Sequence, residues 1–193
     1  SCRVTWHKPL RVVCTTGYVA DLVRHVGGQR IELKCLMGPG VDPHLYKPRL
    51  ADKWKLNWAD VTFYHGLHLE GRLAWLLEKR AQRRPVFPVT EILERRFPDR
   101  LIRTEEGQAV DPHVWFDVAL WAHCVRYVAD KLSEIDPRGT DLYRRNSGAY
   151  FSQLMSLHDW VQRQIATIPR RQRVLVTAHD AFAYFGRAYS VEV

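Results

Sequence analysis

The sequence contains no run of about 18 apolar residues, which excludes a helical membrane span within its 193 residues. It also lacks, at its start, the succession of charged, apolar and small residues that marks a signal peptide. Mature exported proteins lack that succession as well, so its absence does not decide in which cellular compartment the protein works. The chain is long enough to bury a sizeable hydrophobic core.

Cysteine is scarce, and its spacing excludes the common cysteine-based sites. The four cysteines are Cys2, Cys14, Cys35 and Cys124. None belongs to a CxxC pair, so we predict neither a cysteine zinc site nor a disulfide framework. Cys14 and Cys35 fall within apolar runs and are interpreted as buried small hydrophobic residues. Cys2 is compatible with a lipid-modified N-terminal cysteine.

The chain is basic, but its charge is dispersed. Lys and Arg number 29 against 21 Asp and Glu, which gives a net charge of +8. The densest basic stretch, residues 79–84, follows a helix-like segment and precedes Pro85, as is typical of a solvated helix end. The seven tryptophans lie mostly at helical spacing or beside the motifs described next, and packing accounts for them. A nucleic-acid-binding module needs clustered cations interleaved with exposed aromatic residues, so it is a less favoured alternative.

The tripeptide DPH occurs twice, at residues 42–44 and 111–113, each time followed by a hydrophobic and an aromatic residue. Asp42 before a proline is typical of a helix N-cap, which would fix the backbone that presents His44. We expect Asp42 and Asp111 to act as caps, or as hydrogen-bond acceptors that orient the imidazole rings.

A third histidine, His179, ends the apolar run 174–177, much as His44 comes after the run 31–37. Because ligands of open parallel sheets lie beyond the carboxyl ends of the strands, histidines at three strand ends can converge on one point. Imidazole is a common ligand of zinc and also serves manganese and iron, and three of them leave one position for a carboxylate or water. We therefore predict a metal site formed by His44, His113 and His179.

The other histidines are less informative. His65 and His68 lie in the sequence HGLHLE with Glu70, which lacks the HExxH spacing that places two imidazoles on one face of a helix. We interpret both as structural, with a place at the entrance of the metal site as the alternative. The remaining four, interpreted as surface or packing residues, are His7, His25, His123 and His158.

Strand-like and helix-like runs alternate through the first part of the chain. Strands are expected at 11–16, 31–37, 61–64 and 85–89, and helices at 18–26, 48–59 and 69–81. This order predicts an α/β fold with a doubly wound, mostly parallel sheet. Residues 94–110 are expected to be irregular, and 114–135 to form one helix. A long helix capped by Thr140 is expected to run to Pro169, over about 40 Å.

The last residues predict a strand at 173–177, a helix at 180–189 and the start of a strand at 191–193. A lobe of that size cannot bury its own sheet, so we expect a fragment, or a second half supplied elsewhere. The predicted division is an N-terminal α/β lobe (1–136), a long linking helix (137–169) and the start of an incomplete C-terminal α/β lobe (170–193).

Five segments together resemble the TroA-like (cluster A-I) zinc- and manganese-binding solute-binding proteins of bacterial metal ABC transporters. They are VVCTTGYVADLV, LMGPGVDPHLYKP, ADVTFYHGLHLEG, DPHVWFDVALW and VLVTAHDAFAYFGRAY, spread over nearly the whole chain. The resemblance implies two α/β lobes joined by one long helix, and a non-enzymatic, high-affinity receptor that hands a divalent metal to a membrane permease.

The resemblance also implies a location and a ligand set. It implies a periplasmic or extracytoplasmic monomer, free or lipid-anchored, that binds its metal through His44, His113 and His179. The family's fourth ligand, an acidic residue late in the second lobe, is expected beyond Val193. A histidine rather than a glutamate as third ligand favours zinc, then manganese, then iron. The loop before His113 lacks the histidine-rich insertion common in dedicated zinc-uptake members.

A zinc-dependent hydrolase that uses the three histidines and a metal-bound water is the main alternative. It would need a free general base beside the metal, and no motif position supplies an obvious one.

Overall fold

The computed structural model describes residues 8–104 and 109–193, so the interpretations of Cys2 and His7 concern residues outside the described part. The strands are β1 (Leu10–Cys14), β2 (Ile31–Cys35), β3 (Val61–Tyr64) and β4 (Val86–Pro88). The α-helices are α1 (Gly17–Gly27), α2 (Leu50–Trp58), α3 (Arg72–Ala81), α4 (Glu91–Arg96), α5 (Val118–Trp121), α6 (His123–Ile135), α7 (Thr140–Ala166) and α8 (Ala183–Tyr189). Short 3-10 helices are η1 (Gly28–Arg30), η2 (Pro98–Arg100), η3 (Val114–Phe116), η4 (Pro137–Gly139) and η5 (Arg170–Gln172).

The four strands form one parallel sheet in the order β2-β1-β3-β4. Side chains alternate across it, because successive residues of a strand point to opposite faces. Val12 and Phe63 belong to a core on one face, whereas Val13 and Tyr64 belong to a second core on the other face. The predicted α/β class with a parallel sheet covered on both sides is confirmed.

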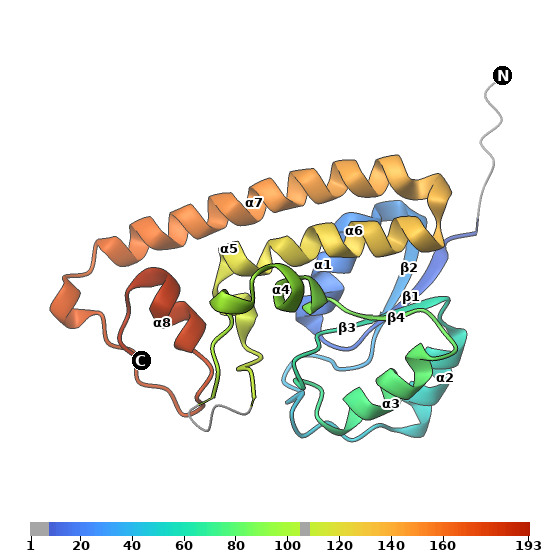
Figure 1. The fold of residues 1–193 in the computed structure, drawn as a ribbon, viewed down its shortest axis with the longest axis horizontal. Helices are drawn as coiled ribbons and strands as arrows, with labels where there is room; N and C mark the ends of the chain where they lie inside the picture. Colours follow the sequence, from blue (N-terminus) through green and yellow to red (C-terminus); the bar gives the residue numbers. More distant parts are fainter. Residues whose placement is uncertain (1–7, 105–108) are drawn as a thin grey trace.

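Helices cover both faces of the sheet. Figure 1 shows α1, α6 and α7 stacked on one side and α2 and α3 on the other. The first group packs through apolar residues such as Leu22, Val125 and Leu132, and the second through Leu56 and Leu77. Among the described residues, none of the helices combines the length and the apolar character that a membrane crossing requires.

The long helix α7 comprises 27 residues, consistent with the predicted helix of about 40 Å. It begins after Gly139, and Thr140 is its first residue rather than its cap, since the Thr140 hydroxyl donates to Pro137 O. Tyr143 and Leu154 are buried, whereas Leu157 and Ile168, farther along the chain, are exposed, so the apolar side chains of this segment are covered mainly in its first half. Figure 1 shows why: α7 extends past α5 and α6 toward α8.

Several expected elements differ in the structure. Residues 114–135 do not form one helix, because Asp117 caps a new helix by accepting a hydrogen bond from Leu120 N, which separates η3 from α5. Residues 94–110 are not wholly irregular, since α4 and η2 reach to Arg100. The expected strand 173–177 is reduced to one parallel bridge between Val174 and Glu192, and α8 begins three residues later than expected, at Ala183. The division into three parts stays a prediction.

Candidate metal centre

The chain reaches His44 from the end of β2. Backbone hydrogen bonds continue the pairing with β1 through Leu36 and Met37, and a loop then leads to the first DPH motif. Asp42 does not cap a helix, because the described residues around it are not helical. Its carboxylate instead accepts a hydrogen bond of 2.8 Å from the backbone N–H of His44. The motif is therefore a tight turn that fixes the backbone of His44, while this hydrogen bond to Asp42 does not orient its ring.

The second DPH motif holds its histidine more firmly. Asp111 Oδ1 accepts hydrogen bonds from both the backbone N–H and the ring Nδ1 of His113, at 3.0 and 2.6 Å. Because a carboxylate can only accept, Nδ1 carries the proton in the neutral ring and Nε2 presents its lone pair. His113 is 6% exposed, so the ring is held in place by its surroundings as well. The expectation that Asp111 orients an imidazole agrees with this geometry.

The three histidines lie together, although not by the route expected. His44 follows β2 only after a loop, His113 follows an antiparallel bridge between Arg103 and Val110, and His179 lies in an exposed bend before α8. Only the first of them is thus connected to a strand of the main sheet. What brings them together is the packing of three loops at one end of the sheet.

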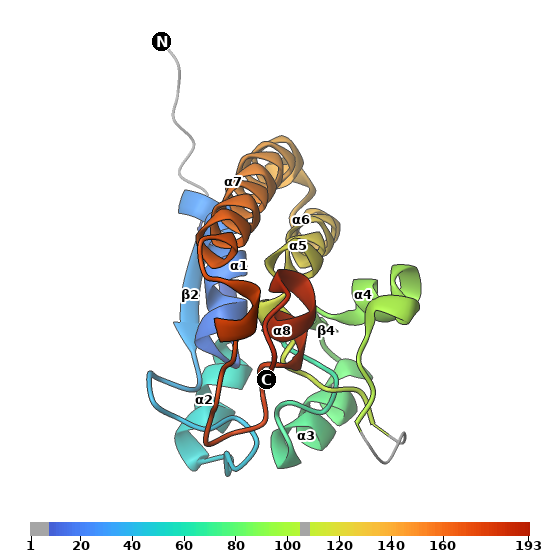
Figure 2. The same ribbon diagram turned by 90° about the vertical axis from the view of Figure 1, so that its left-hand side faces the viewer.

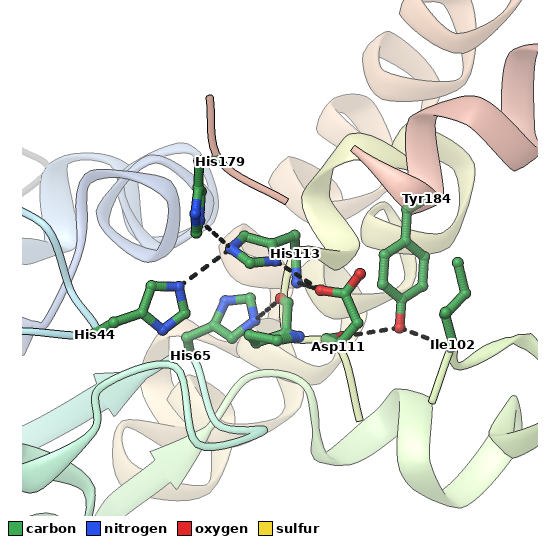
Figure 3. A network of polar contacts seen from close by, with 8 residues as sticks. His44, His65, Ile102, Asp111, His113, His179 and Tyr184 are labelled. Atoms are coloured by element: carbon green, nitrogen blue, oxygen red, sulfur yellow. Dashed lines mark hydrogen bonds and ion pairs between the residues drawn. The ribbon is translucent and has the colours of Figure 1, made fainter. Parts of the chain in front are cut away.

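Figure 3 shows the three rings pointing toward a common centre. His113 Nε2 lies 3.2 Å from His44 Nε2 and 3.3 Å from His179 Nε2. One ligand nitrogen from each of the three residues lies within 4.8 Å of the other two. A cavity of about 300 Å³ opens beside them. Its aromatic walls are Tyr18, Trp115, Phe116 and Phe182.

This donor set fits a transition metal ion. Nitrogens bound to zinc at about 2.0–2.1 Å in a tetrahedron lie about 3.3–3.4 Å apart, which is close to two of the observed separations. Burial, and then the nearby His113, lower the pKa of His44, so its ring is neutral and able to bind metal near neutral pH. His179 is the exposed member of the set and closes it from the side of α8.

The loop that connects β3 to α3, residues 65–71, supports both DPH motifs. The ring of His65 is fully buried, and its Nε2–H donates a hydrogen bond of 2.7 Å to Pro112 O, directly before His113. Burial lowers the pKa of His65 to about 3, so this ring stays neutral. On the other side of the loop, a Cβ built on Gly71 would lie only 2.6 Å from His44 O. Residues 65–71 therefore set the distance between the two motifs.

A buried carboxylate shapes this loop. Glu70 accepts hydrogen bonds from the Thr15 hydroxyl and from the backbone N–H groups of His65 and Gly66. The sequence interpretation of His65 as structural agrees with its burial, but its contact with Pro112 was not foreseen. His68 is exposed and is not part of the histidine cluster.

A tyrosine connects the third histidine's segment to the second motif. Tyr184, on α8, is fully buried; its hydroxyl accepts from Ile102 N and donates to Asp111 O, both at 2.9 Å. Burial raises the pKa of Tyr184 to about 12, so the hydroxyl keeps its proton for this bond. Figure 3 shows the tyrosine beside Asp111, on the far side from His44.

The remaining histidines have other partners. His25 stacks on Tyr150, His123 lies against Phe97, and His158 Nδ1 lies 3.2 Å from the hydroxyl of Tyr189. All three take packing or surface roles, as their lack of a motif indicated.

Comparisons with known proteins agree with this geometry. The family model ZnuA, described as zinc-uptake complex component A, periplasmic, matches residues 12–193. The manganese-binding lipoprotein MntA of Bacillus subtilis is 43% identical over 95% of this chain and 59% of its own length. The metal ABC transporter substrate-binding lipoprotein SloC of Streptococcus mutans is 33% identical over 97% of this chain and 62% of its own.

A zinc-binding protein gives the structural counterpart. TroA of Treponema pallidum is 43% identical over 96% of this chain and 59% of its own length. Its solved structure superimposes with a TM-score of 0.91 at 41% identity, over 96% of this chain and 66% of that structure. The chain thus spans about 60% of the length of these curated relatives. The sequence match across residues 12–193 and the shared fold show that the chain belongs to the ZnuA family of periplasmic zinc-uptake components.

Proposed function

We propose that this chain contributes the metal-capturing residues of a receptor that binds a divalent transition metal outside the cytoplasm and delivers it to the permease of an ABC transporter. The observation that carries the proposal is the convergence of one nitrogen each from His44, His113 and His179 within 4.8 Å. The names of MntA, TroA and SloC, which refer to manganese binding, zinc binding and metal ABC transport, support it. The metal is cargo, so the site has to bind it and later release it.

Zinc is the proposed preferred metal, ahead of manganese and then iron. Imidazole nitrogen suits zinc better than manganese, which prefers oxygen ligands. Three nitrogens are available here, and the resemblance to the family implies an acidic fourth ligand from the second lobe. The strength of binding by the whole receptor therefore depends on more than these three residues.

The hydrolase alternative lacks support. A metal-bound water needs a free general base, but the carboxylates of both motifs are occupied. Asp42 is bonded to the backbone of His44, and Asp111 to the ring of His113. The relatives described above are named as binding proteins and not as enzymes.

We further propose that the receptor acts as a monomer, because all three imidazoles come from one chain. Sedimentation velocity with and without zinc tests this, since a metal-bridged dimer would double the mass.

We also propose that Cys2 is lipid-modified, as the lipoprotein names of MntA and SloC suggest. Mass spectrometry of the membrane-associated protein from cells would show a lipid-modified Cys2, and an unmodified residue there would contradict the proposal.

Metal titration of the chelator-stripped chain tests the proposed site. We expect one zinc per chain, with weaker binding of manganese, measured by calorimetry and by metal analysis after gel filtration. His113→Ala should abolish stoichiometric binding. His25→Ala removes an imidazole that lies on α1 against Tyr150, and should leave binding unchanged. Equal loss in both variants, or full binding by His113→Ala, would contradict the assignment.

A further inference from the structure

A groove between α2 and α3 combines positive charge with exposed apolar side chains. The α2–α3 groove has a volume of about 890 Å³. Its apolar lining is formed by Pro48, Leu50, Leu56 and Leu76. Its cationic lining is formed by Arg49, Lys53, Lys79, Arg80, Arg83 and Arg84. The basic stretch 79–84 is therefore more than a solvated helix end, because five of its six residues, four of them cations, line one groove with cations from the neighbouring segment.

The positive charge of the groove is largely uncompensated. The acidic residue in its lining is Asp52, which is buried, and its carboxylate accepts hydrogen bonds from the Tyr46 hydroxyl and Arg49 N. Arg80 is engaged with Leu56 O and Asn57. Among the described residues, no ion pair involves Lys53, Lys79 or Arg83. These three cations are free to meet an anionic partner.

Large apolar side chains stand exposed on the same two helices. Leu50 and Trp54 on α2 are 74% and 72% exposed, and Trp75 on α3 is 60% exposed. The expectation that packing accounts for the tryptophans is therefore wrong for these two, and also for Trp160 on α7, which is 52% exposed. Lys79 Nζ lies 3.8 Å from the centroid of the Trp75 ring, so a cation and an aromatic ring form one contact surface. Figures 1 and 2 show α2 and α3 next to each other on the side of the molecule opposite α7.

From this combination we propose that the α2–α3 surface, the groove with Trp54 and Trp75, binds the headgroup region of a membrane that contains anionic phospholipids. Lys and Arg are attracted to the negative surface potential of such a membrane, while Trp and Leu side chains insert at its interface. Nucleic acid would match the cations but not the exposed leucines. An acidic protein segment would match the charge, but it gives no particular reason for two exposed tryptophans on neighbouring helices.

Bilayer binding at this surface would bring the metal centre close to the membrane. Pro48 and Arg49 line the groove only a few residues after His44, so the loop that presents the first imidazole runs directly into the surface. A receptor docked in this way would release its cargo beside the membrane. The inference is independent of metal binding, because no residue of the α2–α3 surface belongs to the histidine cluster.

Vesicle sedimentation with chelator present tests the inference. The probes are vesicles of phosphatidylcholine alone and of phosphatidylcholine mixed with phosphatidylglycerol. We expect binding to the mixed vesicles and at least about tenfold weaker binding to the neutral ones. Each Lys or Arg near the membrane surface is expected to raise the affinity for the anionic vesicles about fivefold at moderate salt. Salt of about 1 M, which shortens the Debye length to about 3 Å, should remove most of the binding.

Matched variants assign the binding to this surface. The triple variant Lys53→Gln, Lys79→Gln, Arg83→Gln should lose at least about tenfold in affinity. The control Arg144→Gln, Arg145→Gln, Arg171→Gln removes the same charge from exposed positions elsewhere and should bind nearly as the parent does. Trp54→Ala with Trp75→Ala should weaken binding, whereas Trp160→Ala, which removes an exposed tryptophan of α7, should not. Absence of binding to anionic vesicles at low salt, or an equal loss of affinity in the Arg144, Arg145 and Arg171 control, would overturn the inference. An acidic protein segment would then be the better candidate partner of the groove.

Discussion

Asp111 accepts a hydrogen bond of 2.6 Å from the ring of His113, whereas Asp42, at the same place in the first motif, reaches only the backbone of His44. Two identical tripeptides therefore hold their histidines differently. The ring of His113 is fixed before a metal arrives, and it is the one whose Nε2 lies close to both other imidazoles. His113 is the fixed centre of the cluster, and His44 and His179 approach it from either side.

This asymmetry predicts unequal effects of the two aspartates. Asp111→Ala removes the acceptor that sets the tautomer and orientation of His113, so zinc affinity should fall by about 10- to 100-fold. Asp42→Ala removes only a hydrogen bond to the backbone of His44, so its zinc affinity should fall by a smaller factor. Calorimetric zinc titration of both variants checks the order. Equal losses would show that turn geometry, rather than ring orientation, matters in both motifs.

His65 is expected to act on the metal site through Pro112. His65→Leu fills the buried space but cannot donate to Pro112 O, so zinc should bind more weakly although the variant folds. His65→Gln keeps a donor and should restore much of the affinity. The visible absorption of bound Co²⁺, which reports coordination geometry, separates an altered site from a merely less stable protein. Parent-like spectra and affinity in His65→Leu would contradict this positioning role.

The sequence was sufficient to predict the sheet and to single out the three histidines that the structure brings together. Both are marked by patterns of residues that lie close together in the sequence. The strand at 61–64 has the bounds that its apolar run indicates, and the repeated DPH marks two of the three rings. How the chain brings the three histidines together was not predictable from such local patterns. His113 and His179 are positioned by loops whose contacts join residues far apart in the sequence, such as Tyr184 with Asp111.

The supporting loop 65–71 shows why such features escape sequence analysis. Leu67 and His68 adopt positive φ angles of 51° and 59°, which their residue types do not indicate. The exposure of Trp54 and Trp75 was missed for a related reason, because helical spacing tells which residues share a face but not whether another element covers that face.

Gly71 is expected to be intolerant of a side chain. Its φ is +47°, and a Cβ would meet His44 O at 2.6 Å, so Gly71→Ala should destabilise the fold by about 1–3 kcal/mol and also displace the first motif. Gly148→Ala provides the control, because its Cβ meets nothing within 4 Å in the middle of α7. That change should stabilise by about 0.5–1 kcal/mol and leave zinc binding intact. Urea denaturation and zinc titration of both variants measure the two effects; unchanged zinc affinity in Gly71→Ala would contradict the contact.

The pair of Arg11 and Asp60 predicts part of the acid sensitivity. Arg11 donates two side-chain hydrogen bonds to Asp60, of 2.6 and 3.1 Å, and these hold the pKa of Asp60 below its usual value against the opposing effect of burial. A lowered carboxyl pKa stabilises the fold above the unfolded value of about 3.9, and this stabilisation is lost as the pH falls through the folded pKa.

Asp60→Asn should therefore destabilise by about 0.5–1 kcal/mol near neutral pH, a small effect because both side chains are partly exposed. The difference from the parent should shrink as the pH falls below the unfolded-state pKa of about 3.9 and through the lower pKa of the folded state. Urea denaturation at a series of pH values measures it, with Asp130→Asn on the exposed face of α6 as the control. A difference that persists unchanged at low pH would mean that the charge of Asp60 is not the cause.

Tyr184 should couple the third histidine's segment to the second motif. Its hydroxyl joins Ile102 N to Asp111 O from a buried position, so Tyr184→Phe leaves a partly buried N–H and a partly buried carbonyl without this partner, at a cost of about 1–3 kcal/mol. Because Asp111 orients His113 and α8 follows His179, zinc affinity should fall together with stability. Tyr189→Phe removes a buried hydroxyl from the same helix, one that faces His158 instead, and should lower stability without weakening zinc binding. Zinc titration of both variants, in buffer where each is fully folded, distinguishes them, and equal zinc affinities would show that α8 positions His179 without help from this hydroxyl.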